Sequence, residues 1–148
     1  MQMDKFTIKA AEAIQGAQQL AQQRGNPEVT PLHLLAALVS AEASGNGGLI
    51  TPLLEKAGAH VAQIRSMVES ELKRLPQRSG GSLSVHRTFA DMLQAADKEA
   101  ERMNDQYISS EHLLLALVEV QRGGLLVRLA AVVVRQSVTV QPSAVLFS

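Results

Sequence analysis

Apolar residues recur at spacings of three and four along much of the chain, and this period predicts amphipathic helices. The first covers residues 4–24, with Asp4 as the expected cap and the turn at 25–27 as the expected end. Thr30 and Pro31 then open a second helix, because Thr favours the N-cap and Pro the first helical position. That helix is expected to reach about Glu42.

The same pattern predicts the elements of the rest of the chain. A loop at 44–48 precedes a short helix, Leu53 to Ala57, and a longer helix from about His60 to Leu75. Three further elements follow after residue 84: a helix from about Val85 to Met103, a turn at 104–106, and a helix from roughly Glu111 to Val120 capped by Ser109 or Ser110.

The pattern occurs twice, at an offset of 79 residues. Residues 29–39 and 108–118 are identical at six of eleven positions, and His33 falls on His112. Such a repeat predicts two similar helical units packed as one all-α domain. The expected limits, for a single domain over 1–148, are repeat one at about 3–75, a flexible linker at 76–84 and repeat two at about 85–124.

The second repeat is atypical after Gly124. Residues 120–148 contain three Arg, no Lys and no acidic residue, with many Val. Residues 125–134 are expected to form a short helix, whereas 137–140 have the β-branched character of an extended segment. We therefore treat 125–148 as an atypical apolar tail.

Composition narrows the classes of partner. The 148 residues carry 14 basic and 14 acidic side chains, so no net field favours nucleic acid or an anionic membrane. No cysteine is present, which fits a reducing compartment. The N-terminus lacks a signal-peptide stretch, and no apolar run is longer than 129–134, which is too short to span a bilayer. A cytoplasmic location is expected.

The sequence offers no catalytic motif. No lysine follows a glycine, so a phosphate-binding P-loop is absent, and no Ser-His-Asp arrangement has a nucleophile elbow. His33 and His112 lack a second His or Cys at helical spacing, so metal ligation is disfavoured. Packing against the preceding helix, or bonding a backbone carbonyl, is the favoured role for both. We expect no enzyme activity, cofactor or metal on this chain.

Two of the differences between the repeats bear on a possible binding site. The turn at 104–107 holds the only tyrosine, Tyr107, and Glu111 stands where repeat one has Leu32. Each also has an ordinary interpretation. Glu111 suits the first turn of a helix, where the dipole favours an acid, and Asp105 suits a turn. Thr7 is interpreted as an exposed helix residue or one bonding a backbone carbonyl.

Several blocks resemble the N-terminal domain of the Clp AAA+ unfoldases. They are Asp4-Lys-Phe-Thr7, Thr30-Pro-Leu-His-Leu-Leu-Ala-Ala-Leu38, Pro52-Leu-Leu-Glu-Lys-Ala-Gly58 and Tyr107-Ile-Ser-Ser-Glu-His-Leu-Leu-Leu-Ala-Leu117. The likeness covers about residues 3–122. The linker Leu75-Pro-Gln-Arg-Ser-Gly-Gly81 looks most like the disaggregase branch, ClpB.

The resemblance implies a fold of up to eight helices, tethered above a hexameric ring whose AAA+ modules bind ATP. It implies capture of unfolded or aggregated polypeptide, together with an adaptor or a DnaK-type chaperone system. A polar cluster tied to substrate handling in this family maps onto Thr7, Asp105 and Glu111. A neighbouring apolar groove would lie around Phe6, Tyr107 and the exposed side of the 111–120 helix.

Two functions follow as expectations. The first is a non-catalytic peptide-binding domain of a disaggregase, in which Asp105 and Glu111 favour basic flanks of an apolar segment. The alternative is a docking domain for a folded adaptor protein, as in the protease-linked Clp members.

Overall fold

The computed structural model describes residues 3–39, 61–78 and 80–120, and this part is mostly helical, as predicted. In chain order the elements are a 3-10 helix (Met3–Lys5), α1 (Ile8–Gln23), β1 (Glu28–Val29), α2 (Pro31–Val39), α4 (Val61–Leu72), β2 (Ser84–Val85), α5 (Arg87–Arg102) and α6 (Ser110–Val120). The expected helix at 53–57, residue His60 and the tail 125–148 lie outside the described residues.

The first long helix begins later than the sequence pattern suggests. Helix α1 starts at Ile8, and its N-cap is Thr7, whose hydroxyl accepts a hydrogen bond from Ala10 N at 3.2 Å. The prediction that Asp4 caps this helix is wrong, because Asp4 lies in the separate 3-10 turn. Phe6 interrupts the helical path by forming a parallel bridge with Ile108.

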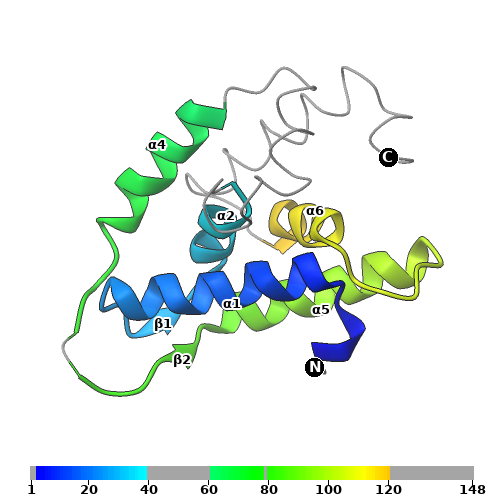
Figure 1. The fold of residues 1–148 in the computed structure, drawn as a ribbon, viewed down its shortest axis with the longest axis horizontal. Helices are drawn as coiled ribbons and strands as arrows, with labels where there is room; N and C mark the ends of the chain where they lie inside the picture. Colours follow the sequence, from blue (N-terminus) through cyan, green and yellow to red (C-terminus); the bar gives the residue numbers. More distant parts are fainter. Residues whose placement is uncertain (1–2, 40–60, 79, 121–148) are drawn as a thin grey trace.

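Each repeat forms a packed helix pair. Helix α1 packs on α2 and α5 packs on α6, while α4 packs on α2. Helix α2 is buried almost all round, which explains its nearly unbroken apolar sequence. Helix α4 lies at one end of the molecule and the turn between α5 and α6 at the other (Figure 1). The core is built from aliphatic side chains, alanines and two phenylalanines; its largest fully buried members include Phe89, Leu34, Leu35, Met92 and Ile108.

The repeats are joined by two equivalent bridges. In repeat one, Phe6 pairs with Ile108 of repeat two; 79 residues on, Val85 pairs with Val29 of repeat one in the parallel β1–β2 ladder. The backbone bonds match as well: Thr7 N donates to Ile108 O and His86 N donates to Val29 O, both at 3.0 Å. The start of each repeat is therefore tied to the central turn of the other.

The end of repeat one and the linker also contact repeat one itself. Helix α4 buries Ile64, Val68 and Leu72. The segment after it returns to the turn between α1 and α2. There Arg78 N donates to Gly25 O at 2.7 Å, and Asn26 Nδ2 donates to Pro76 O at 2.9 Å. The first residues of the expected flexible linker are thus held against the fold.

Candidate functional site

Two matched polar groups, which we call the histidine triads, lie at the starts of α2 and α6. The first consists of Asn26, Thr30 and His33, and the second of Asp105, Ser109 and His112. Each residue of the first falls on its counterpart at the 79-residue offset. The shared structural role expected for the two histidines is confirmed, but their partners differ from those expected.

The first triad holds a neutral histidine. His33 Nδ1 accepts the backbone N–H of Thr30 at 3.0 Å, so the ring proton lies on Nε2, which donates to Asn26 Oδ1 at 2.8 Å. Burial, and secondarily the charge of Arg24, lowers the pKa of His33 to about 4. His33 occupies the third helical position and reaches back to the N-cap, the role that Glu plays in a capping box.

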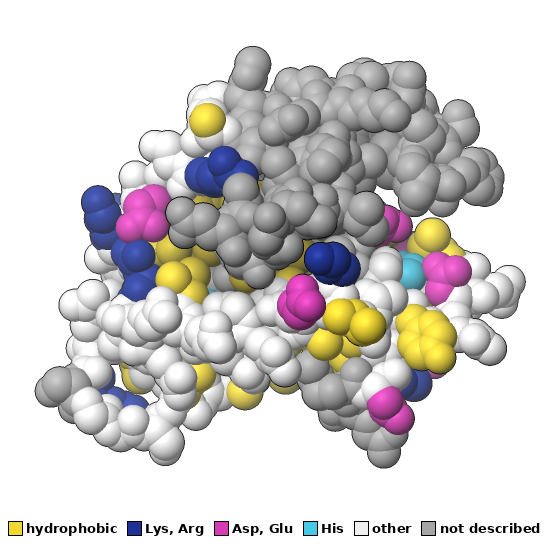
Figure 2. All heavy atoms as spheres, viewed as in Figure 1, with side chains coloured by type: hydrophobic (Ala, Val, Ile, Leu, Met, Phe, Trp, Pro, Cys, Tyr) yellow, Lys and Arg dark blue, Asp and Glu magenta, His cyan; other side chains and the backbone are white. Residues whose placement is uncertain are grey.

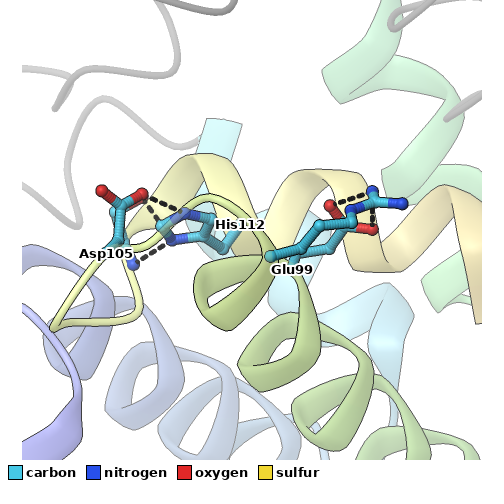
Figure 3. A network of polar contacts seen from close by, with 5 residues as sticks. Glu99, Asp105 and His112 are labelled. Atoms are coloured by element: carbon cyan, nitrogen blue, oxygen red, sulfur yellow. Dashed lines mark hydrogen bonds and ion pairs between the residues drawn. The ribbon is translucent and has the colours of Figure 1, made fainter.

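The second triad repeats this geometry with a carboxylate. His112 Nδ1 accepts the backbone N–H of Ser109 at 2.8 Å, and Nε2 lies 2.9 Å from Asp105 Oδ2. Figure 3 shows Asp105 and His112 facing each other, with Glu99 farther along, where it binds Arg102. Both ring nitrogens are engaged in each triad, so neither histidine is available to a metal in this arrangement. Among the described residues, no group of three possible ligands could hold a metal ion.

The two triads differ in what they expose. Asn26 is only 5% exposed, whereas the side chain of Asp105 is 47% exposed. Oxygen Oδ2 of Asp105 binds His112, and Oδ1 has no hydrogen-bond partner among the described residues. Repeat two therefore presents a partly exposed carboxylate with one of its two oxygens hydrogen-bonded, where repeat one buries an amide.

Glu111 adds a second carboxylate beside Asp105. It is half-buried at the start of α6, and within the part of the chain that the structure describes it makes no hydrogen bond or ion pair. Its pKa is raised by burial and by the charge of Asp105, against an opposing effect of His112. The dipole of α6 favours an acid here, but desolvation opposes it, so the charged form of Glu111 is destabilised.

The other three predicted site residues differ in their exposure and in their contacts. Tyr107 is 54% exposed, as a contact residue requires, but Phe6 is only 6% exposed and belongs to the core. The Thr7 hydroxyl caps α1, and among the described residues it makes no hydrogen bond to Asp105 or Glu111. Thr7 is nevertheless close to the turn, since its backbone N–H bonds Ile108 O.

Ile8, and not Phe6, is the exposed apolar residue at the start of α1. It is 78% exposed, and it and Tyr107 are each one residue from the bond between Thr7 and Ile108. We call Ile8, Tyr107, Asp105 and Glu111 the acidic–apolar surface. Figure 2 shows yellow apolar and magenta acidic side chains adjoining one another at the end of the molecule where the α5–α6 turn lies. Sequence reasoning missed Ile8, although apolar residues at 6 and 8 cannot both face one side of a helix.

A different, polar hollow lies along the far part of α1. Its volume is about 540 Å³, and it is lined by four glutamines of α1 and by residues 78 and 80–83. None of the residues predicted as a site lines it. Within the described ranges, no helix is long and apolar enough to cross a bilayer.

Comparison with known proteins agrees with the repeat and the fold. A family model described as the Clp repeat (R) N-terminal domain matches residues 5–131. The chaperone protein ClpB of Rhodopirellula baltica is 40% identical over 116 residues, which is 78% of this chain and 13% of that protein. ClpB of Vibrio cholerae is 39% identical over 121 residues, 80% of this chain and 14% of its own length. The chain thus spans about one seventh of these relatives.

Solved structures share the fold. The N-terminal domain of Hsp104 from Candida albicans matches with a TM-score of 0.76 at 23% identity, over 94% of this chain and 93% of that one. A ClpV N-domain in complex with a VipB peptide matches with a TM-score of 0.74 at 20% identity, over 97% and 88%. At such identities the likeness concerns the fold alone.

Proposed function

The chain belongs to the family of Clp repeat N-terminal domains, and on that premise we propose that its acidic–apolar surface captures unfolded or aggregated polypeptide. The domain is the N-domain of a ClpB-type or Hsp104-type chaperone and is not the catalytic part of such a protein. In our proposal it uses no cofactor of its own. ATP is consumed by the AAA+ modules of a hexameric full-length protein in the cytoplasm, which thread the captured segment.

One observation carries the proposal: exposed apolar side chains adjoin two carboxylates that have no Lys or Arg partner among the described residues. Ile8 and Tyr107 offer apolar area to hydrophobic segments that folded proteins bury. Asp105 and Glu111 repel each other, and a Lys or Arg beside such a segment relieves that repulsion. The surface therefore suits apolar stretches flanked by basic residues, at low affinity and with little sequence preference.

The solved relatives support a peptide ligand. One ClpV N-domain was solved with a VipB peptide, and another similar structure carries a peptide of the SciI protein. These peptides belong to those proteins. They show that the fold can present a peptide-binding surface, which is what our proposal asks of this chain.

The test is binding of a permanently unfolded model protein to matched variants. Asp105→Asn and Glu111→Gln each remove one charge with little change in shape. Asp91→Asn removes an equally exposed acid away from this surface, near the start of α5, where Asp91 faces Arg87. We expect the first two to weaken binding several-fold and Asp91→Asn to leave it unchanged. Equal binding by all four proteins would contradict the proposal, and one stoichiometric folded partner in place of unfolded clients would favour the adaptor-docking alternative.

A further inference from the structure

The turn after α5 has the same backbone as the turn after α1. Asn26 N donates to Ala21 O and Asp105 N donates to Ala100 O, each at 2.9 Å. The residue before each has a left-handed backbone, with φ of 72° at Gly25 and 60° at Asn104. The backbone thus follows the same helix-ending path in both repeats.

In repeat one this turn already holds a peptide, which is the chain's own segment 76–78. Two hydrogen bonds fix it: Arg78 N donates to the carbonyl of Gly25, and Asn26 Nδ2 donates to the carbonyl of Pro76. The segment therefore meets one acceptor and one donor at the turn, through its backbone alone. The two contacts do not depend on the side chains of the segment.

In repeat two the corresponding groups are unoccupied among the described residues. The carbonyl of Asn104 corresponds to that of Gly25, and Asp105 Oδ1 corresponds to Asn26 Nδ2. Neither makes a hydrogen bond within the described ranges. The exchange of an amide for a carboxylate turns the donor into an acceptor, so this turn offers acceptors only.

We propose that the α5–α6 turn binds an extended polypeptide segment as the α1–α2 turn binds residues 76–78, with a Lys or Arg replacing the Pro76 carbonyl. A backbone N–H of the segment donates to the carbonyl of Asn104. The neighbouring basic side chain donates to Asp105 Oδ1, the oxygen that His112 leaves free. This rests on the function proposed above and adds a backbone contact and a defined basic position to it.

The charges around the turn leave it open to a cation. Two described basic residues that adjoin the turn, one in sequence and one through the backbone bond from Ile108 N to Lys5 O, have acidic partners: Arg102 binds Glu99, and Lys5 Nζ lies 3.4 Å from Asp97 Oδ1. Glu111 supplies a further unpaired carboxylate next to Asp105. A bound Lys or Arg thus meets two acids that no described Lys or Arg side chain neutralises.

The test uses NMR titration of the whole chain with short capped peptides that carry one Arg among apolar residues. Analogues N-methylated at one backbone position at a time remove one N–H each. We expect one analogue to bind about fivefold more weakly, the loss of one hydrogen bond, and the others to bind like the parent. Asp91→Asn should bind normally, because it removes an equally exposed acid near the start of α5, where Asp91 pairs with Arg87, and leaves the α5–α6 turn unchanged.

A charge exchange provides the second arm. Asp105→Asn restores the donor of repeat one, so it should lose affinity for the Arg peptide. It should gain binding of a neutral capped peptide, Leu-Pro-Gln-Ala, which copies residues 75–78 with alanine in place of the arginine. Binding that is insensitive to every N-methylation, or no gain for Asp105→Asn, would overturn the inference while capture of polypeptide stands. No binding of any basic peptide or unfolded protein would overturn both.

Discussion

Asn26 and Asp105 hold equivalent positions and have different roles. Asn26 is buried, and its amide joins His33 to the linker through bonds from both of its polar atoms. Asp105 keeps the bond to the equivalent histidine and leaves one oxygen to solvent. At the residue scale, both repeats keep the bond from the histidine to residue 26 or 105. The second polar atom of that side chain is available for binding only in repeat two.

Glu111 is expected to cost stability at neutral pH. Its pKa is raised in the folded state, so folding favours the protonated form, and stability falls as pH rises through the folded pKa. Glu111→Gln should therefore raise the free energy of unfolding at pH 7 by about 0.5 kcal/mol, a size typical of partly exposed sites. Urea denaturation at pH 7 and pH 3.5 tests this, and the gain should vanish at the lower pH.

A destabilised Glu111 would be a binding residue retained at a cost. If Glu111→Gln lowers stability at pH 7, the carboxylate has a structural role that the geometry does not reveal. Weaker client binding by that variant would then need another explanation.

His33 should make the fold sensitive to mild acid. Its pKa is about 4 in the folded chain and 6.5 as a free side chain, so the unfolded chain binds the proton first. This difference in pKa corresponds to roughly 3 kcal/mol of the free energy of unfolding. That contribution is fully present above pH 6.5 and is lost as pH falls from there to 4. Chemical denaturation at several pH values from 7.5 to 4.5 should show the free energy of unfolding falling as pH falls. The His33→Gln variant should show a smaller fall. An NMR titration of His33 with a midpoint near 6.5 would contradict this expectation.

At the scale of elements, the start of α1 shows where sequence patterns fail. The apolar period begins at Phe6, so local reasoning extends the helix to Asp4. The actual start depends on a contact 102 positions away, because Phe6 pairs with Ile108 and leaves Thr7 to cap the helix. A residue that pairs across the repeats carries no local signal of that contact.

Thr7 should behave first as a cap. Thr7→Ala removes the acceptor for Ala10 N and should lower the free energy of unfolding by about 1 kcal/mol, whereas Thr7→Ser should stay near the wild type. Chemical denaturation measures both. If client binding is lost in Thr7→Ala but not in Thr7→Ser, we attribute the loss to the missing cap at the start of helix α1. Equal stability of all three proteins would show that the cap contributes nothing.

Gly16 offers a stabilising change within the same helix. A Cβ at this position would lie 3.5 Å from the Cβ of Ala37 in α2, an ordinary packing distance. Gly16→Ala should therefore raise the free energy of unfolding by about 0.5–1 kcal/mol through helix propensity. Thermal denaturation tests it, and a fall in Tm would mean that α1 and α2 pack too closely for a methyl group.

At the scale of the molecule, the repeat was readable because its core positions recur at a fixed offset. That offset also relates Asn26, Thr30 and His33 to Asp105, Ser109 and His112, so the triads could have been found from sequence. Their hydrogen bonds could not, since an expected carbonyl partner proved to be a backbone N–H. The exposed place of Ile8 likewise depends on where α1 begins.

The α1–α2 and α5–α6 helix pairs have different turns. Residues 76 and 78 of the linker are hydrogen-bonded to the α1–α2 turn. The acidic–apolar surface lies at the α5–α6 turn (Figure 2). The chain covers about one seventh of the length of its ClpB relatives. What the domain itself contributes, in our proposal, is a surface for polypeptide.

The most direct measurement is a map of where an unfolded polypeptide touches the domain. An isotopically labelled chain, titrated with a permanently unfolded model protein, reports every backbone amide at once. We expect shifts to concentrate at residues 7–8 and 103–111 and to be absent from the equivalent turn at 24–32, which the linker occupies. Shifts centred on 24–32 or on the glutamine-lined hollow of α1, or no shifts at all, would contradict the proposed capture surface.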